Sequence, residues 1–164
     1  MSTDLGPSFR LAFITTDADL PVPSVPELLA RVRSSPAWDG ASIVPVGAQF
    51  PRVHLEWRAD HGFVLQCFED DQSWSYFLVS TPSFAAPSID VELGGQALEP
   101  WPPELFVSAQ VAHQASEYFL DFGKQDPALN WVRIDAFPRE TVWEGPEGRV
   151  AWERANPTPI RCGV

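Results

Sequence analysis

Acidic side chains are the residues of this chain whose spacing could do chemistry. Glu69, Asp70 and Asp71 are adjacent in a predicted turn, and Asp90 and Glu92 alternate along a predicted strand. Two carboxylates in different surroundings can divide the acid and base roles of a reaction. However, three adjacent acids are typical of a solvated turn, and an alternating pair is more often the polar side of an antiparallel strand. Without a histidine, cysteine or positioning arginine nearby, neither group predicts catalysis.

The histidines and cysteines form no recognisable motif. His54, His61 and His113 have none of the spacings of zinc-binding or metalloprotease sites. Cys67 lies in an apolar run typical of a buried thiol, and Cys162 is expected to be an exposed one. Two cysteines are too few for a disulfide framework, and we disfavour a bond between them. Because nucleophile and phosphate-loop motifs are also missing, we expect no enzyme, no metal and no cofactor.

Two aromatic residues stand next to the acidic turn. Trp74 and Tyr76 alternate within a predicted strand at residues 73–80, so they are expected on one face of it. Large aromatic side chains are mostly buried, and a core position is therefore the first interpretation. If that face is open, the pair would be interface anchors, because aromatic residues carry much of the energy of protein interfaces.

The net charge of −11 is concentrated in one stretch of the chain. Residues 59–123 hold ten acids and neither lysine nor arginine, whereas the segments on either side are close to neutral. Such a balance argues against binding to nucleic acid or to an anionic membrane, both of which need clustered bases. General solubility is one interpretation. The length of the base-free stretch favours another, an acidic surface that attracts a basic partner.

Length and composition predict one domain. The 164 residues are 45% hydrophobic and include seven tryptophans, enough for a core that needs neither disulfides nor metal. The domain is expected to span residues 1–164, with its core at about 8–153 and an irregular, proline-containing tail at 154–164. The N-terminus lacks the pattern of a secretory signal, and no apolar run is long enough for a membrane span. The expected compartment is therefore the cytoplasm.

Hydrophobic periodicity predicts two helices and several short strands. Ser24 and Glu27 have the spacing of a capping box, and Pro36 ends the first helix. Ser108 is a predicted N-cap for the second helix, which Gly123 ends. Strands are expected at residues 8–15, 52–58, 63–68, 73–80, 89–93 and 131–137, with a hairpin at 141–153. Short sequential strands favour an α+β fold, a mostly antiparallel meander with two helices packed on it.

The segment between Val53 and Trp131 resembles a known family. A strand pair, an acid-bearing turn and a Gly-Gly turn precede a helix that runs into the sequence YFLDFGKQDPALNW. Six positions carry the resemblance: Ala112, Ala115, Phe119, Gly123, Pro127 and Trp131. Over residues 25–137 the chain is similar to immunity protein family one of bacterial polymorphic toxin systems. These positions are structural, since the glycine ends the helix and the tryptophan packs a strand.

The resemblance implies a cytoplasmic α+β protein that binds and inactivates a toxin encoded beside it, frequently a nucleic-acid deaminase. Such a toxin needs a surface that accepts phosphates, so an acidic inhibitor is suited to cover it. We therefore predict an immunity protein, a monomer that covers the toxin's substrate groove in a 1:1 complex. The expected toxin-binding residues are Glu69, Asp70, Asp71, Trp74, Tyr76, Asp90 and Glu92. The alternative is a small-molecule-binding or enzymatic domain that uses the aromatic sheet face as a pocket wall.

Overall fold

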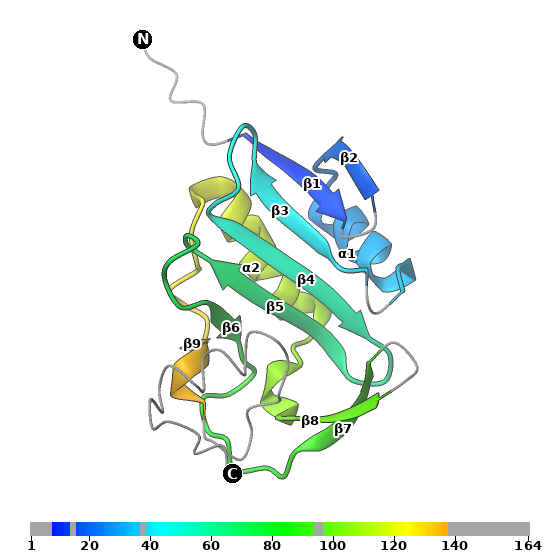
Figure 1. The fold of residues 1–164 in the computed structure, drawn as a ribbon, viewed down its shortest axis with the longest axis vertical. Helices are drawn as coiled ribbons and strands as arrows, with labels where there is room; N and C mark the ends of the chain where they lie inside the picture. Colours follow the sequence, from blue (N-terminus) through cyan, green and yellow to red (C-terminus); the bar gives the residue numbers. More distant parts are fainter. Residues whose placement is uncertain (1–7, 14–15, 37–38, 94–96, 138–164) are drawn as a thin grey trace, which may run out of the picture.

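The fold is α+β, with two helices and an antiparallel, unclosed seven-stranded sheet (Figure 1). The computed structural model describes residues 8–13, 16–36, 39–93 and 97–137. Within them the strands are β1 (Phe9–Phe13), β2 (Thr16–Pro21), β3 (Ala41–Pro45), β4 (Arg52–Arg58), β5 (Gly62–Phe68), β6 (Tyr76–Leu78), β7 (Ile89–Leu93), β8 (Ala97–Trp101) and β9 (Trp131–Arg133). The helices are α1 (Val25–Ser34), α2 (Ala109–Phe122) and two 3-10 turns, η1 (Pro103–Leu105) and η2 (Ile134–Ala136).

The order of the main sheet is β2-β1-β3-β4-β5-β6-β9, and every pairing in it is antiparallel. Strands β3 to β6 form an antiparallel meander that contains the strands predicted at residues 52–58, 63–68 and 73–80, whereas the strand predicted at 89–93 pairs in a separate two-stranded sheet. The start of β4 and the end of β5 meet at one end of the sheet, where Arg52 pairs with Phe68. Phe9 of β1 pairs with Pro45 of β3 at the same end. We name it the β5–β6 end, because it carries the turn at residues 69–75.

Both predicted helices are present, with the predicted caps. The Ser24 hydroxyl accepts a hydrogen bond from the Glu27 N–H at 3.4 Å, and α1 ends before Pro36. The Ser108 hydroxyl accepts from Val111 at 3.3 Å, and Gly123 ends α2 in the left-handed conformation, at φ 67°. These signals are local, so they work without knowledge of the tertiary fold. Neither of the described helices is long and apolar enough to span a membrane.

Each face of the sheet packs against a separate hydrophobic cluster. The helices cover one face, which we call the helical face, and bury Leu28, Val32, Ala112 and Phe119 against Ile43, Leu55 and Leu65. On the opposite, second face, the β7–β8 hairpin and η1 enclose a smaller cluster: Val64, Phe77, Val91, Trp101, Leu105 and Ile134. The hairpin forms a two-stranded sheet of its own. Strand β5 is therefore buried on both faces, which accounts for its almost wholly apolar sequence.

Several strands differ from their predictions. Strands β2, β3 and β8 have no counterpart among the predicted strands. The strand predicted at residues 73–80 is reduced to β6, and the one at 131–137 ends in η2. Strands β2, β3 and β8 are five or six residues long and contain prolines, so the local sequence shows too little alternation to predict them, and their pairing partners lie elsewhere in the chain. The predicted hairpin, the tail and Cys162 lie outside the described residues.

Candidate functional site

The acidic turn between β5 and β6 has one carboxylate that organises the backbone. Asp70 Oδ1 accepts hydrogen bonds from the backbone N–H groups of Gln72, at 2.8 Å, and Ser73, at 2.6 Å. Asp70 Oδ2 accepts from the Ser73 hydroxyl at 2.9 Å. These bonds, first among them that from the Ser73 backbone, lower the pKa of Asp70 below its ordinary value. Glu69 and Asp71 are exposed on either side, so the turn presents its acids in a fixed conformation.

This arrangement predicts a pH-dependent turn. Because the folded pKa of Asp70 lies below the ordinary value of 3.8, its hydrogen bonds are expected to stabilise the turn above about pH 4. They should be lost as the pH falls through the lowered pKa. The backbone amide chemical shifts of Gln72 and Ser73, followed by NMR during acid titration, would report this loss. The matched control is Asp70→Asn, which keeps an acceptor oxygen without titrating, and equal shifts in that variant would contradict the prediction.

Trp74 and Tyr76 do not share a face, so that prediction is wrong. Strand β6 begins only at Tyr76, whose register partner is Cys67 of the cluster on the helical face. Trp74 precedes the strand and packs, partly buried, against the cluster on the second face. The alternation that we assumed requires an extended backbone through Ser75, and the strand does not reach that far. Trp74 thus packs against the core, which was the first interpretation of this residue.

Asp90 and Glu92 lie at the other end of the sheet from the acidic turn. Both are exposed on β7, and the Glu92 carbonyl accepts a 3.4 Å hydrogen bond from Arg58, at the β4–β5 turn. The acidic turn follows the far end of β5, a strand of seven residues. At about 3.3 Å per residue the two acid groups are separated by about 20 Å. The predicted residues therefore form two groups, at opposite ends of the sheet (Figure 1).

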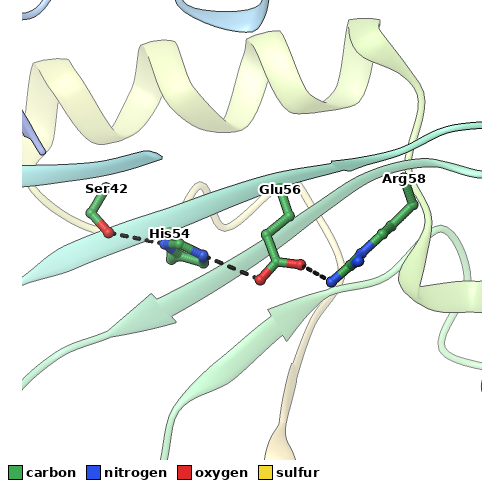
Figure 2. A network of polar contacts seen from close by, with 4 residues as sticks. All are labelled: Ser42, His54, Glu56 and Arg58. Atoms are coloured by element: carbon green, nitrogen blue, oxygen red, sulfur yellow. Dashed lines mark hydrogen bonds and ion pairs between the residues drawn. The ribbon is translucent and has the colours of Figure 1, made fainter. Parts of the chain in front are cut away.

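A network of polar side chains crosses the second face of the sheet (Figure 2). Ser42 of β3 contacts His54 Nδ1 at 3.0 Å, and His54 Nε2 contacts Glu56 Oε1 at 3.2 Å. Glu56 Oε2 accepts from Arg58 at 2.8 Å. His54, Glu56 and Arg58 alternate along β4, and Ser42 is the register partner of His54. The side chain of Arg58 is only 7% exposed, and its guanidinium lies over the Trp101 ring at 5.1 Å.

The carboxylate of Glu56 stays ionised within this network. Burial alone would raise the pKa of Glu56, but the His54 hydrogen bond and the His54 and Arg58 charges lower it overall. An ionised Glu56 accepts from His54 Nε2–H, and the direction of the hydrogen bond between His54 Nδ1 and the Ser42 hydroxyl depends on the protonation of the ring. A hydroxyl–imidazole–carboxylate series of this kind could in principle activate a serine. Here the carboxylate is also held by Arg58, so the contacts tie β3 to β4 rather than prepare a free base.

The sequence contained part of the signal for this network. Alternation along residues 52–58 places His54, Glu56 and Arg58 on one face, but Ser42 enters only through the β3–β4 register. Gly40 also contributes to this network, by leaving room for the His54 ring, and the sequence alone does not indicate this role. A Cβ at this position would lie 2.6 Å from both His54 Nε2 and the Leu55 carbonyl, so only glycine allows this approach.

An open groove of about 710 Å³ lies between α1 and α2 on the outer side of the helical layer. Its apolar wall includes Leu29, and its polar groups include Arg33, His113 and Glu117. Arg33 stacks over the Trp57 ring at 4.7 Å. None of the predicted toxin-binding residues lines the groove, and its charges are of both signs. It therefore offers neither the pocket that our alternative function requires nor a surface of one charge.

The remaining reactive side chains are not brought together. Burial raises the pKa of the Cys67 thiol to about 11, so this cysteine is a poor nucleophile, as expected of a buried thiol. His61 and His113 lie on the β4–β5 turn and on α2. Among the described residues no three His, Cys, Asp or Glu side chains are grouped so that they could hold a metal ion.

Several arginines form ion pairs with acids of the same chain, whereas many acids among the described residues have no such partner. Arg31 pairs with Glu27 at 3.1 Å, Arg58 with Glu56 at 2.8 Å, and Arg133 with Asp135 at 2.6 Å. No ion pair within the described residues reaches five exposed acids of the base-free stretch: Glu69, Asp71, Asp90, Glu92 and Asp121. Much of the negative charge that the sequence concentrates in this stretch therefore remains available at the surface, although Glu104 is buried and Glu117 pairs with His113.

Comparison of the chain with protein-family models, curated proteins and solved structures finds no match in any of the three.

Proposed function

We propose that this protein is an immunity protein, an inhibitor that binds a basic bacterial toxin and covers its nucleic-acid-binding groove. The observation that carries the proposal is the acidic β5–β6 turn, whose exposed Glu69 and Asp71 have no ion pair among the described residues. Asp70 fixes the conformation of this turn. Acids held in place need little ordering on binding, which favours association with a cationic surface. The resemblance to the immunity family agrees with this function.

The proposed mechanism is occlusion. A toxin that acts on nucleic acid presents arginine and lysine side chains to phosphate groups. Carboxylates placed over the same cations displace the nucleic acid without any chemical step. Electrostatic attraction should then make association fast and dependent on salt, while desolvated contacts set the lifetime of the complex. The partner is a toxin domain of the bacterium that makes this protein, which would be protected in the cytoplasm.

The test is the rate of association with the C-terminal domain of the protein encoded beside this gene. We expect a 1:1 complex whose association rate falls with salt concentration, and a further reduction of about tenfold in the double variant Glu69→Gln, Asp71→Asn. This variant leaves Asp70 and its turn intact. Asp60→Asn is the matched control, because Asp60 is an exposed acid at the opposite end of the sheet, at a φ of 68° that asparagine tolerates. No complex, or an association rate that salt does not change, would refute the proposal.

A further inference from the structure

Two exposed apolar side chains lie at the β5–β6 end. Among the described residues Val46 and Phe122 are the large hydrophobic residues that remain mostly exposed, at 62% and 59%. Val46 directly follows Pro45, the register partner of Phe9. The Phe9 ring lies 5.2 Å from that of Phe119, one helical turn before Phe122. The end of β3, the end of α2 and the acidic turn thus share one end of the molecule, at the upper left of Figure 1.

The Phe122 ring is held by a neighbouring aromatic ring and by the capped end of α2. It packs on the Tyr118 ring with centroids 4.5 Å apart and an interplanar angle of 41°. The Gly123 N–H donates to the Phe119 carbonyl at 2.7 Å and holds the last turn of α2. Beyond the cap, Asp126 accepts a 2.9 Å hydrogen bond from Gln114, which ties the next segment back to the helix. An aromatic ring held in this way loses little conformational entropy when a partner covers it.

Asp121 stands where an acid is unfavourable for the helix. The C-terminal end of a helix carries a partial negative charge, which favours bases and disfavours acids in the last turn. The last turn of α2 contains no base, and the exposed Asp121 has no ion pair among the described residues. Glu117 lies one turn earlier, and Lys124 follows the cap as a single base. An acid that opposes the helix dipole beside the exposed Phe122 ring is better explained by binding than by stability.

We propose that the C-terminal end of α2 is the apolar centre of the toxin interface, with Phe122 as its anchor and Asp121 as its charged neighbour. The inference rests on the proposed function and extends it from the acidic turn to a specific surface. The Phe122 ring would enter an apolar recess of the toxin. Asp121 and the acidic turn would then contact the surrounding cations. Charged rims around an apolar centre are the usual arrangement of such interfaces.

The charge of this surface identifies its occupant as a basic protein rather than a second copy of the chain. Two copies, each with a net charge of −11, would bring acids into contact with acids. Arg10 and Arg52 also reach the β5–β6 end, but they lie on the second face, where Arg52 stacks on Phe68 at 4.6 Å. The side of α2 that carries Asp121 and Phe122 is therefore left with acids as its main charges.

The test measures toxin affinity and thermal stability of the same variants. Phe122→Ala is expected to raise the dissociation constant by about 30-fold or more, as truncation of an interface anchor does, with little change in melting temperature. Asp121→Asn should weaken binding while it raises the melting temperature, because it removes the clash with the helix dipole. A purely structural role could not give these opposite signs. Gln110→Ala, an exposed change in the first turn of α2, is the matched control and should bind normally.

The outcomes separate this inference from the proposed function. If wild-type protein binds the toxin and Phe122→Ala binds equally well, the anchor is refuted and the immunity function stands. If wild-type protein does not bind, the proposed function itself fails. Sedimentation velocity of the free protein tests whether a second copy of the chain occupies this surface instead. A dimer that Phe122→Ala dissociates would assign the surface to self-association and overturn the inference.

Discussion

Phe119→Ala is expected to lower the free energy of unfolding by about 3–5 kcal/mol, the usual cost of truncating a buried phenylalanine. The Phe119 ring is 1% exposed and belongs to the cluster between α2 and the sheet. Its contact with Phe9 joins the C-terminal end of α2 to β1, so removing it opens a cavity at this junction. The same junction positions the proposed toxin-binding surface. Urea denaturation, followed by tryptophan fluorescence and by circular dichroism, would measure the loss.

Phe122→Ala on the same helix is the matched control for this prediction. The Phe122 side chain is 59% exposed, so its truncation leaves no cavity and should change the free energy of unfolding by no more than about 0.5 kcal/mol. A loss of similar size in both variants would mean that the helix responds as a whole to any truncation. In that case burial of Phe119 would not explain its contribution.

Glu56→Ala is expected to cost about 3 kcal/mol, because it leaves Arg58 buried without its carboxylate. The side chains of Arg58 and Glu56 are 7% and 23% exposed, and Glu56 also holds His54 at 3.2 Å. The pKa of Glu56 is lowered from its ordinary value of 4.5, so the contribution is present above that pH and lost as the pH falls through the lowered pKa. Denaturation of both proteins at several pH values would show the difference shrinking below about pH 4.5.

Glu27→Ala tests whether position in the fold decides this cost. Glu27 also pairs with an arginine, Arg31, at 3.1 Å, but these side chains are 56% and 43% exposed. An exposed pair at this spacing on a helix contributes only about 0.2–0.5 kcal/mol. Equal losses in the two variants, or a difference that does not change with pH, would contradict the role given to the polar network.

The helices could be predicted in detail because their signals lie within a few residues of each other. Ser24 and Ser108 cap helices that the periodicity alone outlines, and Gly123 supplies the left-handed residue that ends α2. The strands between residues 52 and 68 could be predicted equally well, since polar and apolar residues alternate along β4 and a short turn connects it to β5. Strands β2, β3 and β8 were missed because short edge or proline-containing strands take their stability from a partner strand that the local sequence does not show.

The candidate site was less predictable, since it depends on which segments meet. The acids of the β5–β6 turn are where the sequence placed them, whereas Trp74 turns out to pack on the second face. Asp121 and Phe122 lie within the second predicted helix, and the sequence does not distinguish them from its other residues. An exposed side chain cannot be recognised from helical periodicity when it borders the buried stripe. The proposed binding role of Asp121 and Phe122 rests on their exposure and on the contact of the Phe122 ring with Tyr118.

The sequence by itself determined the α+β class, the two capped helices and the concentration of negative charge between Arg58 and Lys124. Composition and local patterns are sufficient for these properties. The tertiary structure decided how that charge is distributed. Register separates Asp90 and Glu92 from the acidic turn by the length of β5 and brings α2 to the end where the turn lies. Long-range pairing decides such neighbourhoods, because residues far apart in the chain meet only when strand register and helix packing are fixed together.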